Sequence, residues 1–233
     1  MVGHQDLVLA SSRVMLRPGR PVAFAMLAVR GARGWIGGMG RRARARGRGL
    51  GRTMMAAVIE RAAERSLDHV DLEVLVANDW ASRIYEALGF RDVRTLRVLE
   101  RAAGTPAPVS PRSATAFDVP AALDAHFAMY ALATPWQRDR VVLDRVTPTI
   151  SAIAVRSGER VDGVLSTGAT AGALPLLALS ARADAGEAVL TDLLATLCAE
   201  HADAKGVFLN VPGDDPALPE PGARRLRRAF APA

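Results

Sequence analysis

Arg46-Gly47-Arg48-Gly49-Leu50-Gly51 is the stretch of sequence that decides the fold, because it joins a glycine-rich loop to the start of a helix. Glycine has no Cβ atom, so a ligand can approach the backbone closely at Gly49 and Gly51. The helix expected over Arg52 to Arg65 begins with N–H groups that have no partner within the helix, at the positive end of its dipole. The stretch therefore predicts a phosphate-binding loop.

Two other glycine-rich phosphate motifs do not fit these residues. A nucleoside-triphosphate P-loop needs Lys-Ser/Thr after its second glycine, whereas Gly51 is followed by Arg52 and Thr53. The dinucleotide fingerprint Gly-x-Gly-x-x-Gly needs a three-residue step, whereas Gly47, Gly49 and Gly51 are spaced by two. The phosphate that this loop binds therefore belongs to another class of ligand.

The segments around the loop alternate between strand and helix patterns. Apolar runs bounded by glycine and proline predict three strands before the loop, over residues 14–16, 22–29 and 35–39. After the helix, apolar residues alternate with Asp71 and Glu73 in a strand over 70–76. Asn78 caps a second helix that stops at Gly89, and a strand follows over 90–99. The predicted order is β-β-β-α-β-α-β.

The order of these motifs resembles the GCN5-related N-acetyltransferase (GNAT) superfamily. Its cofactor loop reads Arg/Gln-x-x-Gly-x-Gly/Ala, which the segment from Arg46 to Gly51 matches. Further matches are Leu72-Glu73-Val74, Asn78-x-x-Ala81-x-x-x-Tyr85 and Leu88-Gly89-Phe90. The resemblance spans residues 14–100 and implies an α+β fold, a mixed sheet flanked by helices.

The resemblance implies an acetyl-CoA site and direct transfer of the acetyl group to an amine of a small molecule or an amino terminus. It implies that loop amides bind the pyrophosphate, and that the backbone at the end of the third strand pairs with the pantetheine arm. Asn78 would hydrogen-bond that arm, and Tyr85 would protonate the departing CoA thiolate. The cofactor-binding residues so implied are Met39, Gly40, Arg41, Arg46, Gly47, Arg48, Gly49, Leu50, Gly51, Arg52 and Asn78.

The reaction also needs a base, because an amine of pKa about 10.4 is protonated at pH 7 and its lone pair costs roughly 4.6 kcal/mol to expose. The family often places a carboxylate on the third strand, but residues 35–40 contain none. Glu73 on the next strand is the candidate substitute, and a solvated strand residue or a water relay are the alternatives. Plainer roles are also open for Tyr85 as a packing phenol and for Asn78 as a helix cap.

Charge is distributed unevenly along the chain. Residues 1–116 hold 19 basic and 10 acidic side chains, and residues 117–233 hold 11 and 14. Six arginines lie between Arg41 and Arg52, which indicates an anionic ligand. A solvated basic loop and an RNA-binding arm are the alternatives, and RNA is disfavoured because no aromatic residues are interleaved with these arginines.

The second half of the chain is predicted to repeat the first in diverged form. A proline-rich linker, 102–115, separates a domain over 1–101 from a second over 116–215, and 216–233 is left as a tail. The second domain has the order helix, helix, strand, strand, strand, helix, strand and resembles the degenerate acetyltransferase repeat of two-part bacterial family members. Arg182 to Glu187 lies at the position of the phosphate loop without its spacing, and its acids would repel a phosphate. We expect no CoA there.

The family normally has a strand and two helices before the segment that begins at Val14, and here Met1 to Arg13 precede it. We therefore expect a shortened front and an incomplete acceptor side, which makes a non-catalytic CoA-binding or regulatory module the main alternative function. The single Cys198 excludes an internal disulfide, and the four histidines are too dispersed for a metal site. With no membrane-length apolar run, a cytoplasmic protein without a metal is expected, and a homodimer stays open.

Overall fold

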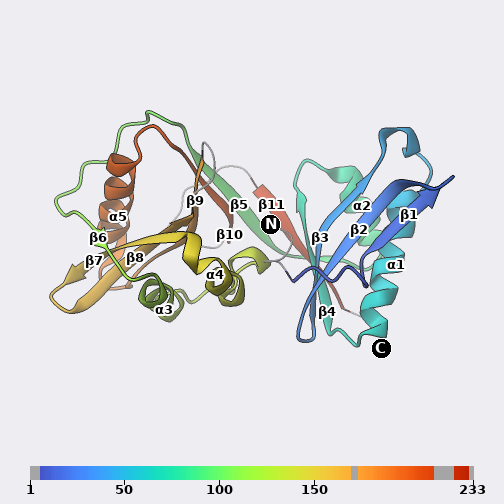
Figure 1. Ribbon diagram of the computed structural model, residues 1–233, viewed down its shortest axis with the longest axis horizontal. Coiled ribbons are helices and arrows are strands. Elements are labelled where there is room, and N and C mark those ends of the chain that lie inside the picture. Colours follow the sequence, from blue (N-terminus) through green and yellow to red (C-terminus); the bar gives the residue numbers. More distant parts are fainter. Residues whose placement is uncertain (1–5, 169–172, 213–222, 231–233) are drawn as a thin grey trace. The chain divides into compact units, whose positions relative to one another are not determined.

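Two groups of strands, each covered by helices, make up this computed structural model, which describes residues 6–168, 173–212 and 223–230 (Figure 1). The first unit comprises Met1–Leu96 with Ala223–Ala233, and the second comprises Arg97–Gly222. The predicted fold class, a mixed sheet flanked by helices, is confirmed in both units. The boundary falls inside one strand, since β5 (Arg91–Arg101) leaves the first unit at Leu96.

The first unit has the strand order β1-β2-β3-β4-β11-β5. Strands β1, β2 and β3 are antiparallel neighbours, β3 and β4 are parallel, and β4 and β11 are antiparallel. The elements are β1 (Arg13–Arg17), β2 (Arg20–Arg30), β3 (Arg33–Arg41), the 3-10 turn η2 (Ala43–Ala45), α1 (Leu50–Glu64), β4 (His69–Leu75), α2 (Asp79–Ala87) and β11 (Ala223–Phe230).

Helix α1 packs on one face of this sheet because both α1 and β4 have a row of apolar side chains on the facing side. Alternate residues of a strand point to the same face, and Val70, Leu72 and Val74 of β4 are all buried. Residues three or four apart on α1, such as Met55 and Val58, are fully buried against them in one cluster. This packing fixes the start of α1, and hence the glycine loop, relative to the ends of the strands.

Strands β3 and β4 stay paired over only four residues. Their register runs from Arg33 opposite His69 to Ile36 opposite Leu72, and it ends there although both strands continue. Gly37 is the next residue of β3, and it is an extra residue in the pairing with β2, that is, a β-bulge. A Cβ atom at Gly37 would lie 2.5 Å from the Trp35 ring, so only glycine fits without displacing that ring. The bulge redirects β3 away from β4.

Strand β11 completes the first unit with residues from the far end of the sequence. It pairs with β4 from Arg224 opposite Leu75 to Phe230 opposite His69. These residues lie in the segment, 216–233, that the sequence left as a tail without structure. Four of the eight residues are arginines, so the strand lacks the alternation of apolar and polar residues that predicts one. Pairing with an interior strand overrides the weak local preference.

The second unit has the strand order β10-β9-β8-β7-β6, with α3 and α5 on opposite faces. Ala152 and Ala154 of β7 pack with α3, whereas Ile153 and Val155 pack with α5. The elements are β6 (Thr115–Ala116), α3 (Val119–Met129), η3 (Trp136–Arg138), α4 (Arg140–Val146), η4 (Thr147–Thr149), β7 (Ile150–Ser157), β8 (Arg160–Gly168), β9 (Ala173–Ala181), α5 (Gly186–Glu200) and β10 (Lys205–Pro212).

The second unit repeats the bulge and the short parallel ladder of the first. Strands β9 and β10 pair in parallel over four residues, and their pairing ends at Leu176 opposite Phe208. Leu177 is then the extra residue of a bulge against β8. Its carbonyl accepts a hydrogen bond of 2.9 Å from Nε of the buried Arg138. Each unit thus has a β-bulge directly after a four-residue parallel pairing, which supports the predicted internal repeat.

The last part of the expected linker is bound to the second unit. Residues 102–114 contain no helix or strand, but Ser110 and Arg112 both hydrogen-bond the carboxylate of Asp192 on α5. The Ala114 N–H donates to Thr196 Oγ1 of the same helix at 2.8 Å. Asp192 is 1% exposed, so its buried carboxylate needs these hydrogen-bond donors, and losing them would leave its charge without compensation.

We expect deletion of residues 223–233 to loosen β4, because the N–H groups that β4 presents to β11 lose their acceptors. Amide exchange over His69–Leu75, measured by mass spectrometry, should be faster by about tenfold or more. Deletion of 231–233 alone, beyond the register of β11, is the matched control and should change nothing. Unchanged protection of β4 after the longer deletion would contradict the role of β11.

Candidate functional site

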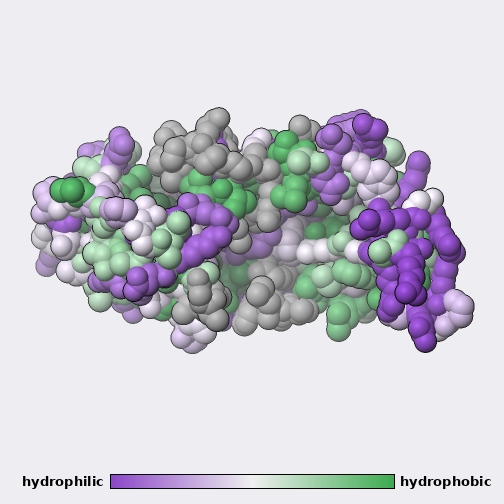
Figure 2. All heavy atoms as spheres, turned by 90° about the horizontal axis from the view of Figure 1, so that it is seen from above, coloured by the Kyte–Doolittle hydropathy of each residue, from purple (hydrophilic) through white to green (hydrophobic). Residues whose placement is uncertain are grey.

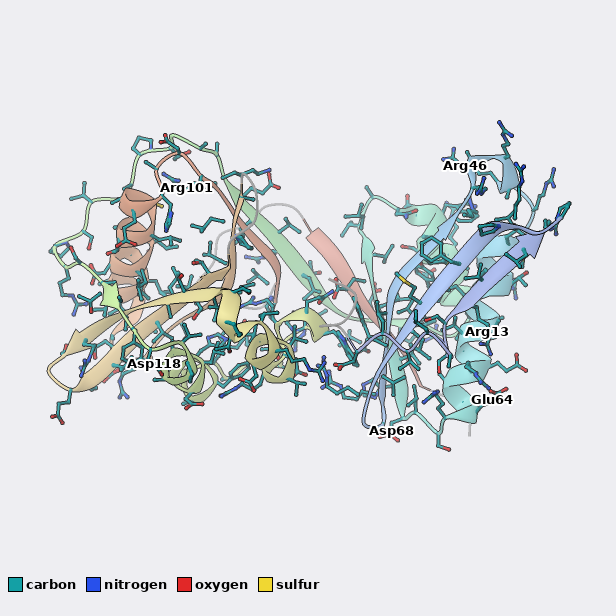
Figure 3. All side chains as sticks on the ribbon, viewed as in Figure 1. Arg13, Arg46, Glu64, Asp68, Arg101 and Asp118 are labelled. Atoms are coloured by element: carbon teal, nitrogen blue, oxygen red, sulfur yellow. The ribbon has the colours of Figure 1, made fainter. Side chains whose placement is uncertain are left out.

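The glycine loop lies between the end of β3 and the start of α1. Gly47 and Gly49 have φ angles of 71° and 70°, in the left-handed region that residues with a Cβ atom avoid. Gly49 is the N-cap of α1 and supplies no side chain to cap it. Figure 3 shows Arg46 in the loop at one end of α1 and Glu64 at the other end of the helix. The two glycines turn the chain so that α1 begins directly at the loop.

The loop presents a row of unpaired backbone donors. Within the described residues, the N–H groups from Gly47 to Arg52 have no hydrogen-bond acceptor, whereas the Thr53 N–H already bonds the Gly49 carbonyl at 3.2 Å. The first turn of α1 carries no acidic side chain to bind them. These donors and the positive end of the helix dipole favour an anion at this point. The geometry therefore fits the phosphate loop that the sequence predicted.

Gly51 lies inside α1 and is buried, so its backbone N–H, not an open side-chain position, is what it can offer a ligand. A Cβ atom there would be 3.4 Å from the Trp80 ring and 3.6 Å from Ile84 Cδ1. The predicted contact of Gly51 with a cofactor stays a prediction. An alanine methyl would make ordinary van der Waals contact there.

The glycines of β3 leave less backbone open than the sequence suggested. A Cβ atom at Gly38 would lie 2.8 Å from Met26 Cε, and one at Gly40 would lie 2.6 Å from the Phe24 ring. The protein's own side chains therefore cover that face of β3. What remains open to a ligand is the edge of β3 beyond Ile36, where its pairing with β4 has ended. Met39, Gly40 and Arg41, the residues predicted to pair with pantetheine, all lie on this edge.

The arginines of the loop divide into anchored and exposed side chains. Arg42 Nε donates to the Pro21 carbonyl at 2.6 Å, and the Arg41 guanidinium lies 4.4 Å from the centroid of the Trp80 ring. The others are exposed: Arg44, Arg46, Arg48 and Arg52. Hydrophilic residues also gather on the first unit at the right of Figure 2. The loop is therefore surrounded by guanidinium groups able to attract a polyanion.

Asn78 and Tyr85 both have structural roles on α2. The Asn78 side-chain oxygen accepts a hydrogen bond of 3.2 Å from the Ala81 N–H, which confirms the helix cap and leaves its amide nitrogen as a further donor. Tyr85 is 8% exposed, and its ring lies 5.9 Å from that of Phe90 within the core cluster. Their proposed contacts with a cofactor stay predictions.

Two carboxylates lie on the β4 face opposite Val70, Leu72 and Val74. Glu73 follows Leu72, the last residue of β4 that pairs with β3, and it is partly buried. Asp71 is 5% exposed, and its Oδ2 lies 3.9 Å from His69 Nε2. The alternating pattern predicted a half-solvated strand, but β4 lies between β3 and β11 and has little exposure on either face. Asp71 is the buried carboxylate that this reading missed.

The corresponding loop of the second unit is closed to anions. The N–H groups of Ala185 and Gly186 both donate to the Arg182 carbonyl at 3.1 Å, so they are already used. Asp184 pairs with Arg182 at 3.0 Å, and this hydrogen bond holds the pKa of its carboxyl below the usual range. Helix α5 adds Glu187 in its first turn. This geometry supports the expectation that the second unit binds no CoA.

A buried polar cluster fills the α3 side of the second unit instead. His126 is fully buried, its Nδ1 lies 3.0 Å from Ser180 Oγ, and Tyr130 stacks on its ring at 5.0 Å. Burial, with Arg138 nearby, lowers the pKa of His126 from 6.5 to about 3. This imidazole is therefore neutral at physiological pH. Nearby, Trp136 is a buried core side chain and Asp139 caps α4.

The described part of the chain offers neither a metal site nor a membrane-crossing helix. Its residues contain no group of three or more histidine, cysteine or acidic side chains placed to hold a metal ion. None of its helices combines the length and the apolar composition needed to cross a membrane. Cys198 is buried, as a small apolar residue would be.

Comparison with known proteins agrees with this geometry. Residues 6–90 match the model of the acetyltransferase (GNAT) family. The likeness to that family therefore covers the segment 6–90 of the first unit. The match includes the glycine loop, Asn78 and Tyr85, and ends at Phe90. No curated protein sequence matches the chain significantly.

Solved structures extend the likeness in fold to the whole chain. A GCN5-related N-acetyltransferase from Sphaerobacter thermophilus is 16% identical with a TM-score of 0.71, covering 95% of this chain and 81% of that one. A tandem GNAT protein from the clavulanic acid biosynthesis pathway is 15% identical with a TM-score of 0.68, covering 100% and 87%. At these identities the likeness concerns the fold, and it confirms a tandem GNAT-like arrangement of two sheets.

We expect Gly49→Ala and Gly51→Ala to act in opposite directions. Alanine at position 49 must adopt a positive φ, which costs about 1 kcal/mol and disturbs the loop. Alanine at position 51 favours the helix by up to about 1 kcal/mol. Urea unfolding should show the two stability changes, and calorimetry should show weaker acetyl-CoA binding for Gly49→Ala alone. Equal effects of both variants would contradict the separate roles of these glycines.

The buried His126 predicts a pH dependence of stability. Its folded-state pKa of about 3 lies below the unfolded value of 6.5. As the pH falls below 6.5 the unfolded chain takes up a proton that the folded chain does not, so stability falls by about 2 kcal/mol between pH 7 and pH 5. Urea unfolding at both pH values should show that His126→Gln loses less. An equal loss in the variant would mean that other groups carry the effect.

Proposed function

We propose that this protein is an acetyl-CoA-dependent N-acetyltransferase that transfers the acetyl group directly to an amine of a small molecule or to an amino terminus. The observation that carries the proposal is the row of unpaired N–H groups from Gly47 to Arg52, which begins where β3 has separated from β4. The N–H groups of the loop suit a pyrophosphate, and the open edge of β3 beside them suits an arm that contains amide groups. In acetyl-CoA a pyrophosphate is followed by such an arm, the pantetheine.

In this proposal the donor lies along the open edge of β3. Amides of the loop bind its pyrophosphate, with Arg46, Arg48 and Arg52 around it. The backbone at Met39, Gly40 and Arg41 pairs with the pantetheine arm as a neighbouring strand would, and the free Asn78 amide nitrogen donates to the same arm. The thioester then points to the part of β3 near the bulge, whose N–H groups could stabilise the oxyanion.

The transfer itself is an attack by the neutral amine on the thioester carbonyl carbon. The new C–N bond forms, the C–S bond breaks, and the nitrogen loses a proton while the sulfur gains one. Glu73, directly or through a water relay, accepts the proton from nitrogen, and the Tyr85 hydroxyl gives one to the thiolate. With reference pKa values of about 8.5 for the thiol and about 10 for the phenol, this donation is uphill by about 2 kcal/mol, which favours concerted C–S cleavage.

One observation favours a second candidate, a CoA-binding module without catalysis. Tyr85 is 8% exposed and contributes to the hydrophobic core, so its hydroxyl has little room for a substrate in this conformation. In such a module the loop would bind the donor and no acetyl group would be transferred. Binding and turnover experiments separate the two functions.

We expect calorimetry to show one acetyl-CoA bound per chain, and a panel of amines to reveal acetyl transfer as thiol release. Tyr85→Phe should bind acetyl-CoA with nearly unchanged affinity but release thiol more slowly by about 10²-fold or more, the usual contribution of a general acid. The ring stays in the variant, so the core keeps its packing.

The outcomes have distinct meanings. Absence of acetyl-CoA binding to the wild-type protein would reject both candidates. Binding without turnover on any amine would favour the non-catalytic module, and turnover unaffected by Tyr85→Phe would remove Tyr85 from the mechanism. Thermal unfolding of Tyr85→Phe serves as the control for an intact core.

A further inference from the structure

Arg41 and Trp80 form a contact at the loop that the glycine motif does not explain. Trp80 lies in the first turn of α2, two residues after the Asn78 cap, and it is 51% exposed although it is a large apolar side chain. Its ring carries the Arg41 guanidinium at 4.4 Å from the centroid. The ring also lies 3.4 Å from the position of a Cβ atom on Gly51. The pair therefore lies against the first turn of α1.

This contact restricts an arginine that would otherwise be free to move. An arginine side chain loses rotamer entropy when it binds a ligand. Stacking on an aromatic ring already restricts the side chain in the free protein, so less entropy is lost on binding. Arg41 is the last residue of β3, so its backbone is fixed by the pairing with Ala23 of β2. Backbone and ring together hold the guanidinium beside the unpaired N–H groups of the loop.

We infer that Arg41 binds the pyrophosphate of the acyl donor through its side chain and that Trp80 is the positioning residue that holds it there. The inference rests on the proposed function and extends it, because the donor loop then combines backbone amides with one guanidinium held in place. Arg42, which is tied to the Pro21 carbonyl, does not share this position. The exposed arginines Arg44 and Arg48 have no comparable support from a ring.

The charges fit this assignment. A pyrophosphate carries two negative charges, and a planar guanidinium can bind two of its oxygens at once. The segment from Arg41 to Arg52 contains no acidic residue that would compete for it. Trp80 lacks a charge of its own, so its removal should act on phosphate binding mainly through Arg41, and its packing against Gly51 is checked separately by thermal unfolding.

The test is calorimetric titration of the full chain with CoA, dephospho-CoA and pantetheine. Arg41→Ala should weaken binding of CoA and of dephospho-CoA by about tenfold, the scale of one hydrogen bond to a charged group at a partly exposed site. Pantetheine lacks phosphate, so its affinity should not change. Arg65→Ala, which removes an exposed arginine at the other end of α1, is the matched control and should leave all three affinities unchanged.

The positioning role has its own readout in a double-mutant cycle. Trp80→Ala should weaken CoA binding nearly as much as Arg41→Ala, and adding it to Arg41→Ala should have little further effect. Trp80→Phe keeps a ring and should restore most of the affinity, whereas Arg41→Lys keeps the charge without the planar stack and should restore only part. Thermal unfolding of each variant checks that the fold is intact.

Four results would overturn the inference. The first is an Arg41→Ala variant that binds CoA with wild-type affinity, and the second is an equal loss of affinity for pantetheine. The third is a loss of affinity confined to CoA, which would assign Arg41 to the 3′-phosphate. The fourth is that the effects of Arg41→Ala and Trp80→Ala on CoA affinity are additive. Failure of the wild-type protein to bind CoA at all would instead reject the proposed function itself.

Discussion

The early end of the β3–β4 ladder is the constraint on which the rest of the first unit depends. Two parallel strands that stayed paired along their whole length would satisfy each other's backbone groups and leave no edge for a ligand. The bulge at Gly37 ends the pairing after Ile36, and the chain can then turn through the two left-handed glycines into α1. Gly37 tolerates no side chain because the Trp35 ring occupies that space. The bulge at Gly37 thus marks where the open edge begins.

The second unit shows that the bulge alone is not sufficient for such a site. It has the same short parallel pairing and the same bulge position, at Leu177, but two N–H groups of its loop donate to the Arg182 carbonyl, and the segment carries Asp184 and Glu187. The sheet geometry depends on core packing, whereas the binding of an anion depends on the exposed donors and charges of the loop. The second unit therefore has the sheet of the first without a loop that suits an anion.

The sequence predicted local features well and distant pairings poorly. The glycine loop, the Asn78 cap and the helix after Gly49 depend on neighbouring residues, and all three are present. The exposure of Trp80, the burial of Asp71 and the strand at Ala223–Phe230 depend on which segments lie next to them in space, which no local pattern specifies. Phe24 and Met26 lie over Gly40 and Gly38, which no local pattern specifies, because the space left by an absent Cβ atom can be filled by any neighbouring side chain. Roles for Tyr85 and Glu73 are still predictions because they require a bound substrate.

The position of β11 between β4 and β5 has a consequence for how the protein is made. The residues of the first unit up to Leu96 leave the ribosome well before Ala223 is joined to the chain, an interval on the order of ten seconds at usual rates of synthesis. During that time β4 has an open edge, which is a hazard for aggregation. The nascent chain can complete its first unit only after the second unit has been translated, so an interrupted translation yields no finished first unit.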